Sequence, residues 1–169
     1  GIKQREGLIK NRYIGRTFIM PTQVSRDVAV RDKLNVIKGE IRGKRVILVD
    51  DSIVRGTTSK RIVTMLRDNG AKEVHMISTC PPVKHPCYYG IDMPTEKELI
   101  AARNTDEVAE IIGADTVTYQ TLKGLVKAIG LKKDELCLAC LNGNYPTHIP
   151  KETMSSLIKT RECERAGGI

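Results

Sequence analysis

The stretch RVILVDDSIVRGTTSK, residues 45–60, decides the expected fold. The four apolar residues near its start are bounded by polar ones, which is typical of a strand buried in a parallel sheet. The residues that follow place Ile62, Val63 and Leu66 at helical spacing, and Gly70 stands where the helix is expected to end. A strand, a loop and a helix in this order predict that the loop lies at the carboxyl end of a parallel strand, where α/β sheets bind ligands.

The rest of the chain alternates in the same way. Further strands are expected at 73–79 and 115–119, and further helices at 96–102, 106–112 and 120–130. Capping-box patterns at 95–98 and 104–107 mark two of the helix starts. This alternation predicts an α/β fold with a parallel sheet. Residues 141–169 show no strong pattern and are expected to form a peripheral C-terminal tail.

The composition is that of an ordinary globular protein of one domain. The chain has 169 residues, of which 40% are hydrophobic and 28% charged. Its apolar runs fall far short of the roughly 20 residues of a membrane span. The charged N-terminal segment lacks the apolar centre of a signal peptide. We therefore expect a cytoplasmic protein with no membrane partner.

The positive charge is concentrated at one end of the chain. Residues 1–45 hold 12 Lys and Arg against four Asp and Glu, whereas the remainder holds 16 of each. Such a segment indicates either an anion-binding surface or a solvated basic face with no partner. Only six aromatic residues are available to stack on bases, so no nucleic-acid partner is expected.

The loop of the opening stretch has the chemistry of a phosphate site. Gly56 allows a close approach of the backbone, and the hydroxyl side chains at 57–59 lie beside the free amides of the helix's first turn. Like charges exclude Asp50 and Asp51 from that phosphate. Their carboxylates suit either the hydroxyls of a neighbouring ribose or a Mg²⁺ ion.

The known phosphate-loop patterns GxxxxGK[ST] and GxGxxG are absent. Instead, residues 46–59 resemble the phosphoribosylpyrophosphate (PRPP) motif of the type I phosphoribosyltransferases. Three further segments resemble glutamine PRPP amidotransferase and stand in the order of that family: GLIKNRYIGRTFIMPTQ (7–23), KHPCYYGIDMPTEKELIA (84–101) and LCLACLNGNYPT (136–147). The resemblance implies a type I phosphoribosyltransferase fold in its C-terminal portion at 1–135, followed by a cysteine-bearing segment at 136–169.

The resemblance also implies the site residues. The residues expected to bind PRPP are Lys33, Asp50, Asp51, Ser52, Arg55, Gly56, Thr57, Thr58 and Ser59. Asp50 and Asp51 would contact the ribose hydroxyls and Mg²⁺. A flexible loop at 7–20 would close over PRPP and supply Lys10, Arg12 and Arg16 as catalytic residues. The basic surplus of the first 45 residues agrees with this, because PRPP is strongly anionic.

The reaction implied is the transfer of the phosphoribosyl group of PRPP to ammonia derived from glutamine. It yields 5-phosphoribosylamine and pyrophosphate in the first committed step of purine synthesis. The family's glutaminase domain, which precedes this region and carries an N-terminal cysteine nucleophile, has no counterpart in the sequence. The resemblance further implies purine nucleotides as inhibitors and a homotetramer. His75, His85 and His148 are scattered and are expected to be structural.

The five cysteines include one pair at metal-ligand spacing. An odd count argues against a disulfide framework. The CxxC pair of Cys137 and Cys140 by itself fits a zinc site or a redox pair. Together with Cys87 it resembles three of the four ligands of the 4Fe–4S cluster in one branch of the family, the fourth ligand lying upstream of this chain. Cys80 and Cys163 match no ligand position of the family and are given no role.

Two other functional classes remain open from the sequence. The same PRPP motif occurs in proteins that sense PRPP and regulate transcription or bind RNA, but such regulators are expected to lack the segments around Cys87 and Cys137. A structural module built on zinc or a cluster is the other class. It would not need the acidic pair Asp50–Asp51 beside a hydroxyl-rich loop.

Overall fold

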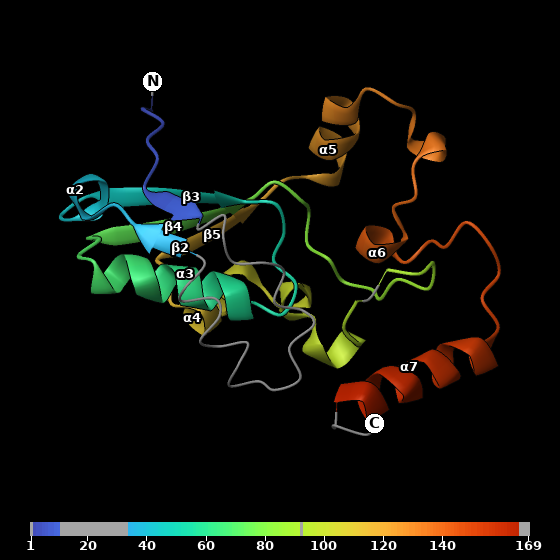
Figure 1. Cartoon of the computed structure of the whole chain (residues 1–169). Helices are drawn as coiled ribbons and strands as arrows, with labels where there is room; N and C mark the ends of the chain where they lie inside the picture. The colour runs from blue at the N-terminus through green and yellow to red at the C-terminus, as the bar shows by residue number, and fades with distance from the viewer. Residues whose placement is uncertain (1, 11–33, 92, 166–169) are drawn as a thin grey trace.

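The computed structural model describes residues 2–10, 34–91 and 93–165. Within them, strands β3 (Arg45–Asp50), β4 (Glu73–Ser78) and β5 (Thr116–Tyr119) form a parallel sheet in the order β3-β4-β5 (Figure 1). Two short strands, β1 (Leu8–Lys10) and β2 (Leu34–Val36), pair antiparallel in a second sheet. The α/β fold with a parallel sheet expected from the sequence is therefore confirmed.

Helices connect and follow the strands. In chain order they are α2 (Lys38–Ile41), α3 (Thr57–Asp68), η2 (Glu96–Glu98), η3 (Ile100–Ala102), α4 (Thr105–Ile112), α5 (Leu122–Ile129), η4 (Lys133–Glu135), α6 (Ala139–Asn142) and α7 (Lys151–Arg165). Figure 1 shows α5 and α6 beyond the carboxyl ends of the strands. Among the helices of the described ranges, none has the length and apolar character needed to span a membrane.

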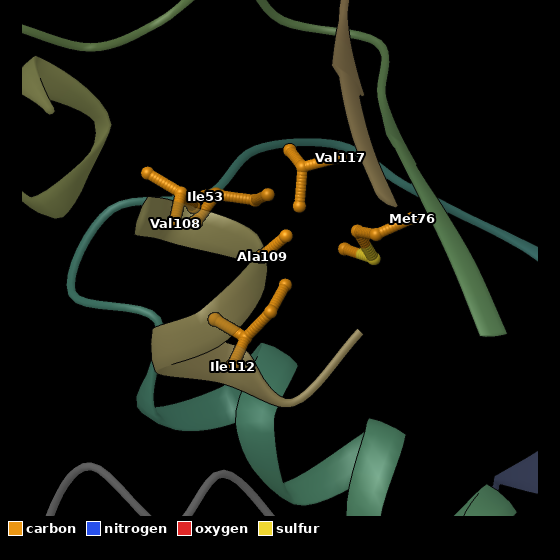
Figure 2. Packing of buried hydrophobic residues seen from close by; sticks show 6 residues of the cluster. All are labelled: Ile53, Met76, Val108, Ala109, Ile112 and Val117. Carbon is orange, nitrogen blue, oxygen red and sulfur yellow. The ribbon is translucent and has the colours of Figure 1, made fainter. Parts of the chain in front are cut away.

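Helices α3 and α4 pack against the same face of the parallel sheet. This follows from the strand order, because two right-handed crossovers that advance in one direction place both helices on one side. The core between these layers includes Met76 of β4, which has no exposed surface, and Ile112 of α4 (Figure 2). Val74 of β4 is equally buried in a second cluster of the core. The loop after β3 contributes Ile53, which is 1% exposed. The start of the expected phosphate loop is thus anchored in the core.

The opposite face of the sheet remains partly open. On β3, Ile47 and Val49 alternate with the core-facing residues and are 41% and 59% exposed. Parallel sheets usually carry cover on both faces and read as continuous apolar runs for that reason. The apolar run predicted a buried strand, but the residues of β3 are half-buried on the face toward the core and exposed on the other.

The helix boundaries follow the capping signals for α3 and α4. The Asn104 side chain accepts a hydrogen bond from the amide of Glu107 at 2.8 Å, and α4 ends at Gly113 with φ +77°. Helix α3 ends just before Gly70, which has φ +88°. Both features were expected from the sequence.

One expectation about helices was wrong, and one helix was not foreseen. The helix expected at 96–102 is two 3₁₀ turns, η2 and η3, separated by Leu99. Leu99 has an extended backbone that places its side chain in the interior at 3% exposure, so burial of this residue interrupts the helix. The tail expected without pattern contains the 15-residue helix α7. Its half-buried residues Met154, Leu157 and Ile158 stand at helical spacing, a signal present in the sequence.

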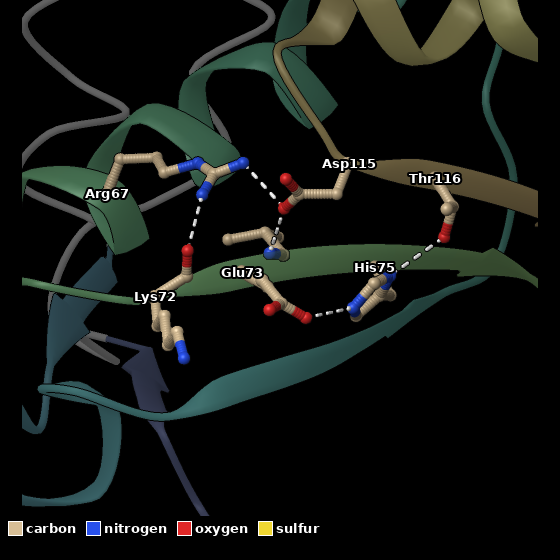
Figure 3. Close-up of polar contacts among 7 residues, drawn as sticks. Arg67, Lys72, Glu73, His75, Asp115 and Thr116 are labelled. Carbon is tan, nitrogen blue, oxygen red and sulfur yellow. Dashed lines mark hydrogen bonds and ion pairs between the residues drawn. The ribbon is translucent and has the colours of Figure 1, made fainter.

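An ion pair fastens the amino-terminal end of β5 to its neighbours (Figure 3). Asp115 Oδ2 accepts from Arg67 Nη2 of α3 and from the buried amide of Val74, both at 2.6 Å. The hydrogen bond from Val74 lowers the pKa of Asp115, as does Arg67, and these effects outweigh the opposing effect of burial. Arg67 also donates to the carbonyl of Lys72 at 3.1 Å. One carboxylate thus joins α3, β4 and β5.

We expect Asp115→Ala to lower the free energy of unfolding by about 1–2 kcal/mol at neutral pH, because it leaves the amide of Val74 without its charged acceptor. Folding lowers the pKa of Asp115, so its contribution is complete above the unfolded-state pKa of about 3.9 and is lost as the pH falls through the lower folded-state value. Urea unfolding at several pH values measures this. The wild type and the variant should start to converge below about pH 4 and coincide only below the folded-state pKa of Asp115, whereas Asp68→Ala on the exposed end of α3 should change little.

Candidate functional site

The acidic pair lies at the carboxyl end of β3. Asp50 is half-buried as the last residue of the strand, and Asp51 is exposed. Burial raises the pKa of Asp50, and the charge of Asp51 raises it further, while a hydrogen bond from the Asp51 amide to Asp50 Oδ1 at 3.0 Å lowers it. Ser52 Oγ donates to Asp51 Oδ1 at 3.2 Å. Two carboxylates in sequence at this edge create a negative site that a divalent cation or a pair of hydroxyl donors would stabilise.

The end of β4 holds the backbone of this pair in place. The amide of Thr79 donates to the carbonyl of Asp50 at 3.0 Å, and the amide of Cys80 donates to the carbonyl of Asp51 at 2.9 Å. The Thr79 hydroxyl also reaches the carbonyl of Asp50, at 3.3 Å. The two segments therefore stay paired just beyond the strands. These hydrogen bonds fix the main chain of the acidic pair and do not involve its carboxylates.

The phosphate loop, which we define as residues 52–56, leads directly into α3. Gly56 precedes the helix with φ +74°, and its carbonyl accepts the first helical hydrogen bond, from Lys60 at 2.7 Å. The N-cap residue, Gly56, makes no side-chain capping hydrogen bond, which leaves the amides of the first turn to other acceptors such as an anion. Thr57 and Thr58 are exposed, whereas Ser59 is buried at 3% exposure. The hydroxyls and amides expected to bind a phosphate are thus together at one helix N-terminus, although the Ser59 side chain faces the interior.

The loop is also held by the segment that contains η2 and η3. Arg55 Nε lies 3.1 Å from Glu98 Oε1, and the amide of Ile100 donates to the carbonyl of Val54 at 3.1 Å. A Cβ atom placed on Gly56 would collide with the side chain of Ile100. Arg55, expected to bind substrate, is therefore engaged with a carboxylate of the protein in this structure.

Of the five basic residues expected near PRPP, the structure describes Arg55 and Lys10. Lys10 ends β1, is exposed, and pairs with Leu34 of β2. Arg12, Arg16 and Lys33 lie outside the described residues, as does most of the flexible loop expected at 7–20.

The cysteine-bearing segment folds back onto residues 83–89. The carbonyl of Cys140 accepts hydrogen bonds from the amides of Lys84 and His85, at 2.9 and 3.0 Å. The Tyr145 hydroxyl donates to the carbonyl of Pro86 at 2.7 Å, and the Tyr145 ring centroid lies 5.1 Å from that of Tyr88. These contacts join two segments of sequence that both carry expected metal ligands.

The thiols of this region influence one another without forming a disulfide among the described cysteines. Burial raises the pKa of Cys140, and the charges of Cys80, Cys87 and Cys137 raise it further. Within the described ranges, however, no three His, Cys, Asp or Glu side chains are arranged to hold a metal ion. Thiolates are suitable ligands for an iron–sulfur cluster, but the described cysteine side chains are not arranged as a ligand set.

Sequence reasoning gave no role to three residues that the structure places at the site: Thr79, Cys80 and Glu98. Thr79 and Cys80 directly follow β4, and the acidic pair stands at the end of β3. Because neighbouring parallel strands end at the same edge of a sheet, the strand pattern could have predicted that these residues lie beside the acidic pair. The contact between Glu98 and Arg55 spans 43 residues and had no signal in the local sequence.

No family model matches the sequence. The chain is 54% identical over 166 residues to the amidophosphoribosyltransferase of Methanothermobacter thermautotrophicus, covering 98% of this chain and 35% of that protein. It is 61% identical over 150 residues to the amidophosphoribosyltransferase of Methanocaldococcus jannaschii, covering 88% of this chain and 31% of the relative. The chain thus spans about a third of the length of these curated relatives.

A solved structure shares the fold. It is the glutamine PRPP amidotransferase from Bacillus subtilis complexed with ADP and GMP, with a TM-score of 0.73 and 54% sequence identity over 86% of this chain and 33% of that one. The parallel sheet therefore has the arrangement of a type I phosphoribosyltransferase domain in part. The shared name of these relatives favours this family over PRPP-sensing regulators. On the agreement of sequence and fold, the chain is similar over nearly its whole length to one portion, about a third, of the proteins named amidophosphoribosyltransferase.

Proposed function

We propose that this chain forms the PRPP site of an amidophosphoribosyltransferase. The observation that carries the proposal is the acidic pair at the carboxyl end of β3, followed directly by the phosphate loop and the N-terminus of α3. The 5-phosphate of PRPP would bind the free amides and the hydroxyls of Thr57 and Thr58, and the ribose hydroxyls would donate to Asp50 and Asp51.

In the proposed reaction, the lone pair of ammonia forms a bond to the anomeric carbon of PRPP. The carbon–oxygen bond to pyrophosphate breaks, pyrophosphate leaves with the electron pair, and the new amine loses a proton to water. The products are 5-phosphoribosylamine and pyrophosphate. Ammonia would come from the hydrolysis of glutamine by a glutaminase domain or subunit. The protein's part is to orient PRPP and to exclude water, and the proposed step uses no nucleophilic side chain of the protein.

Charged groups would assist the departure of pyrophosphate. Mg²⁺, when bound, would neutralise charge on the leaving group. Asp50 and Asp51 fit that ion, because Mg²⁺ commonly takes one or two carboxylates and completes its shell with water and substrate oxygens. Lys10, Arg12, Arg16 and Lys33 would supply positive charge from the flexible loop and its surroundings.

We further propose that Cys87, Cys137 and Cys140 hold a 4Fe–4S cluster together with a fourth ligand. Support comes from the contacts that bring the segments of Cys87 and Cys140 together. Iron and acid-labile sulfide should copurify with the protein isolated without oxygen. Both should fall strongly in Cys140→Ser and stay unchanged in the control Cys163→Ser. Zinc without sulfide would contradict the proposal and favour a zinc site.

The remaining partners are proposed from the family. Purine nucleotides are proposed as inhibitors, since the related Bacillus subtilis enzyme was solved with ADP and GMP. A homotetramer is proposed on family resemblance. A cytoplasmic location is proposed on the same resemblance.

Calorimetric titration with Mg²⁺–PRPP tests the proposed function. The wild type should show saturable binding with one site per chain, and the double variant Asp50→Asn/Asp51→Asn should lose it. Asp134→Asn, on the exposed turn η4, serves as the control and should bind as the wild type does. A folded wild-type protein that does not bind Mg²⁺–PRPP would contradict the proposal.

A further inference from the structure

The carboxylate of Glu98 is held from its own segment and presented to the phosphate loop. Its Oε2 atom accepts from the amide and from the hydroxyl of Thr95, each at 3.0 Å, which completes the capping box of η2. Its Oε1 atom accepts from Arg55 Nε at 3.1 Å. Thr95 is only 6% exposed, so its hydrogen bonds restrain the Glu98 carboxylate in the position in which it contacts Arg55.

Two more contacts join the same segment to the same loop. The amide of Ile100 donates to the carbonyl of Val54, and the side chain of Ile100 fills the space beside Gly56. The loop is therefore attached to residues 95–100 at three successive positions. Ile53, at 1% exposure, anchors its start in the core.

In the absence of substrate, the guanidinium of Arg55 is thus held by the carboxylate of Glu98. A loop that is ordered before its ligand arrives binds more tightly, because less conformational freedom is lost on binding. We propose that Glu98 is a positioning residue of the PRPP site, which holds Arg55 and thereby fixes the phosphate loop against residues 95–100 before PRPP binds. The ligand in this statement rests on the proposed function, whereas the bracing of the loop does not.

The chain contains a matched control for Glu98. Glu107 is also the third residue after a capping residue, Asn104, whose side-chain amide donates to Glu107 Oε1 at 2.6 Å. It also faces an arginine, with Arg103 Nη1 3.9 Å from Glu107 Oε2. Neither residue of this second pair belongs to the phosphate loop. Glu98→Gln and Glu107→Gln therefore remove the same charge from similar surroundings.

The test compares hydrogen exchange and PRPP affinity in the two variants. Glutamine at 98 keeps an oxygen for the Thr95 cap but loses the charge that holds Arg55. We expect faster amide exchange in residues 52–56 and Mg²⁺–PRPP binding about three- to tenfold weaker in Glu98→Gln, with an unchanged melting temperature. Glu107→Gln should change neither quantity. A purely structural role would lower the melting temperature instead of acting on the loop alone.

A double variant separates action through Arg55 from a general effect of the charge. If Glu98 acts through Arg55, then Arg55→Met/Glu98→Gln should bind PRPP no more weakly than Arg55→Met alone. Additive losses, unchanged loop exchange, or tighter binding by Glu98→Gln would overturn the inference. If the wild type does not bind PRPP, the proposed function fails, and the exchange measurement alone then decides whether Glu98 braces the loop.

Discussion

Gly56→Ala is expected to lower the free energy of unfolding by about 2–5 kcal/mol and to abolish PRPP binding. Gly56 has φ +74°, a conformation that costs an alanine of order 1–2 kcal/mol. The added methyl group would also collide with the side chain of Ile100 and lie 3.1 Å from Ile112 Cγ2. The end of the Ile100 side chain can turn aside, but relief of the Ile112 contact shifts α4 or the phosphate loop, and the strained backbone of residue 56 remains. Stability and binding should therefore fall together.

Urea unfolding and PRPP titration of the same samples measure both effects. Gly39→Ala is the control, because nothing lies within 4 Å of a Cβ atom at Gly39 and its φ is not positive. Gly39 lies in α2, so alanine there should be neutral or stabilising by up to about 1 kcal/mol. A Gly56→Ala protein as stable as the wild type would show that the loop can open away from Ile100 at little cost.

Asp50→Asn is expected to weaken PRPP binding while making the free protein more stable. Burial and the charge of Asp51 raise the pKa of Asp50, so its ionised form is unfavourable in the folded state. This unfavourable contribution is complete above the raised folded-state pKa and vanishes as the pH falls below the unfolded-state value. The gain in stability from Asp50→Asn should therefore be present at pH 7 and disappear at low pH. Loss of a charged acceptor should weaken binding about 10- to 100-fold.

Chemical unfolding from pH 3 to 8 and calorimetry with Mg²⁺–PRPP test the two halves of this expectation separately. Asp134→Asn controls for the change of charge alone. If Asp50→Asn were less stable than the wild type at pH 7, Asp50 would have a structural role that its surroundings do not indicate. If it bound PRPP normally, the ribose would lie elsewhere.

The central part of the fold and site was predictable because its signals are local. The run RVILV gave β3, the two aspartates marked its end, and Gly56 followed by hydroxyl residues marked the start of α3. Each signal lies within a few residues of the feature it predicts. The α4 boundaries were predictable for the same reason, from Asn104 and Gly113.

The rest depended on contacts between distant residues. The capping box at Thr95 is present as expected, but the burial of Leu99 interrupts the helix that was expected to follow it. Whether Leu99 is buried depends on the packing of the core and not on its neighbours in the sequence. The engagement of Arg55 by Glu98 is equally non-local. Helix α7 is a different case, because its apolar residues stand at helical spacing but are few, and the local signal was overlooked.

The strand order has a consequence for how the chain assembles. The contact between Thr79 and Asp50 closes 29 residues, whereas the contact between Tyr145 and Pro86 closes 59. Each doubling of the length of a closed loop adds about 0.6 kcal/mol to the entropic cost of closing it. The contact between β4 and the acidic pair therefore has the smaller entropic cost. During synthesis, β3, α3 and β4 are complete by residue 80, before the tyrosine that ties down the cysteine-bearing segment has been made. The backbone contacts of the acidic pair can therefore form before the cysteine-bearing segment is held in place.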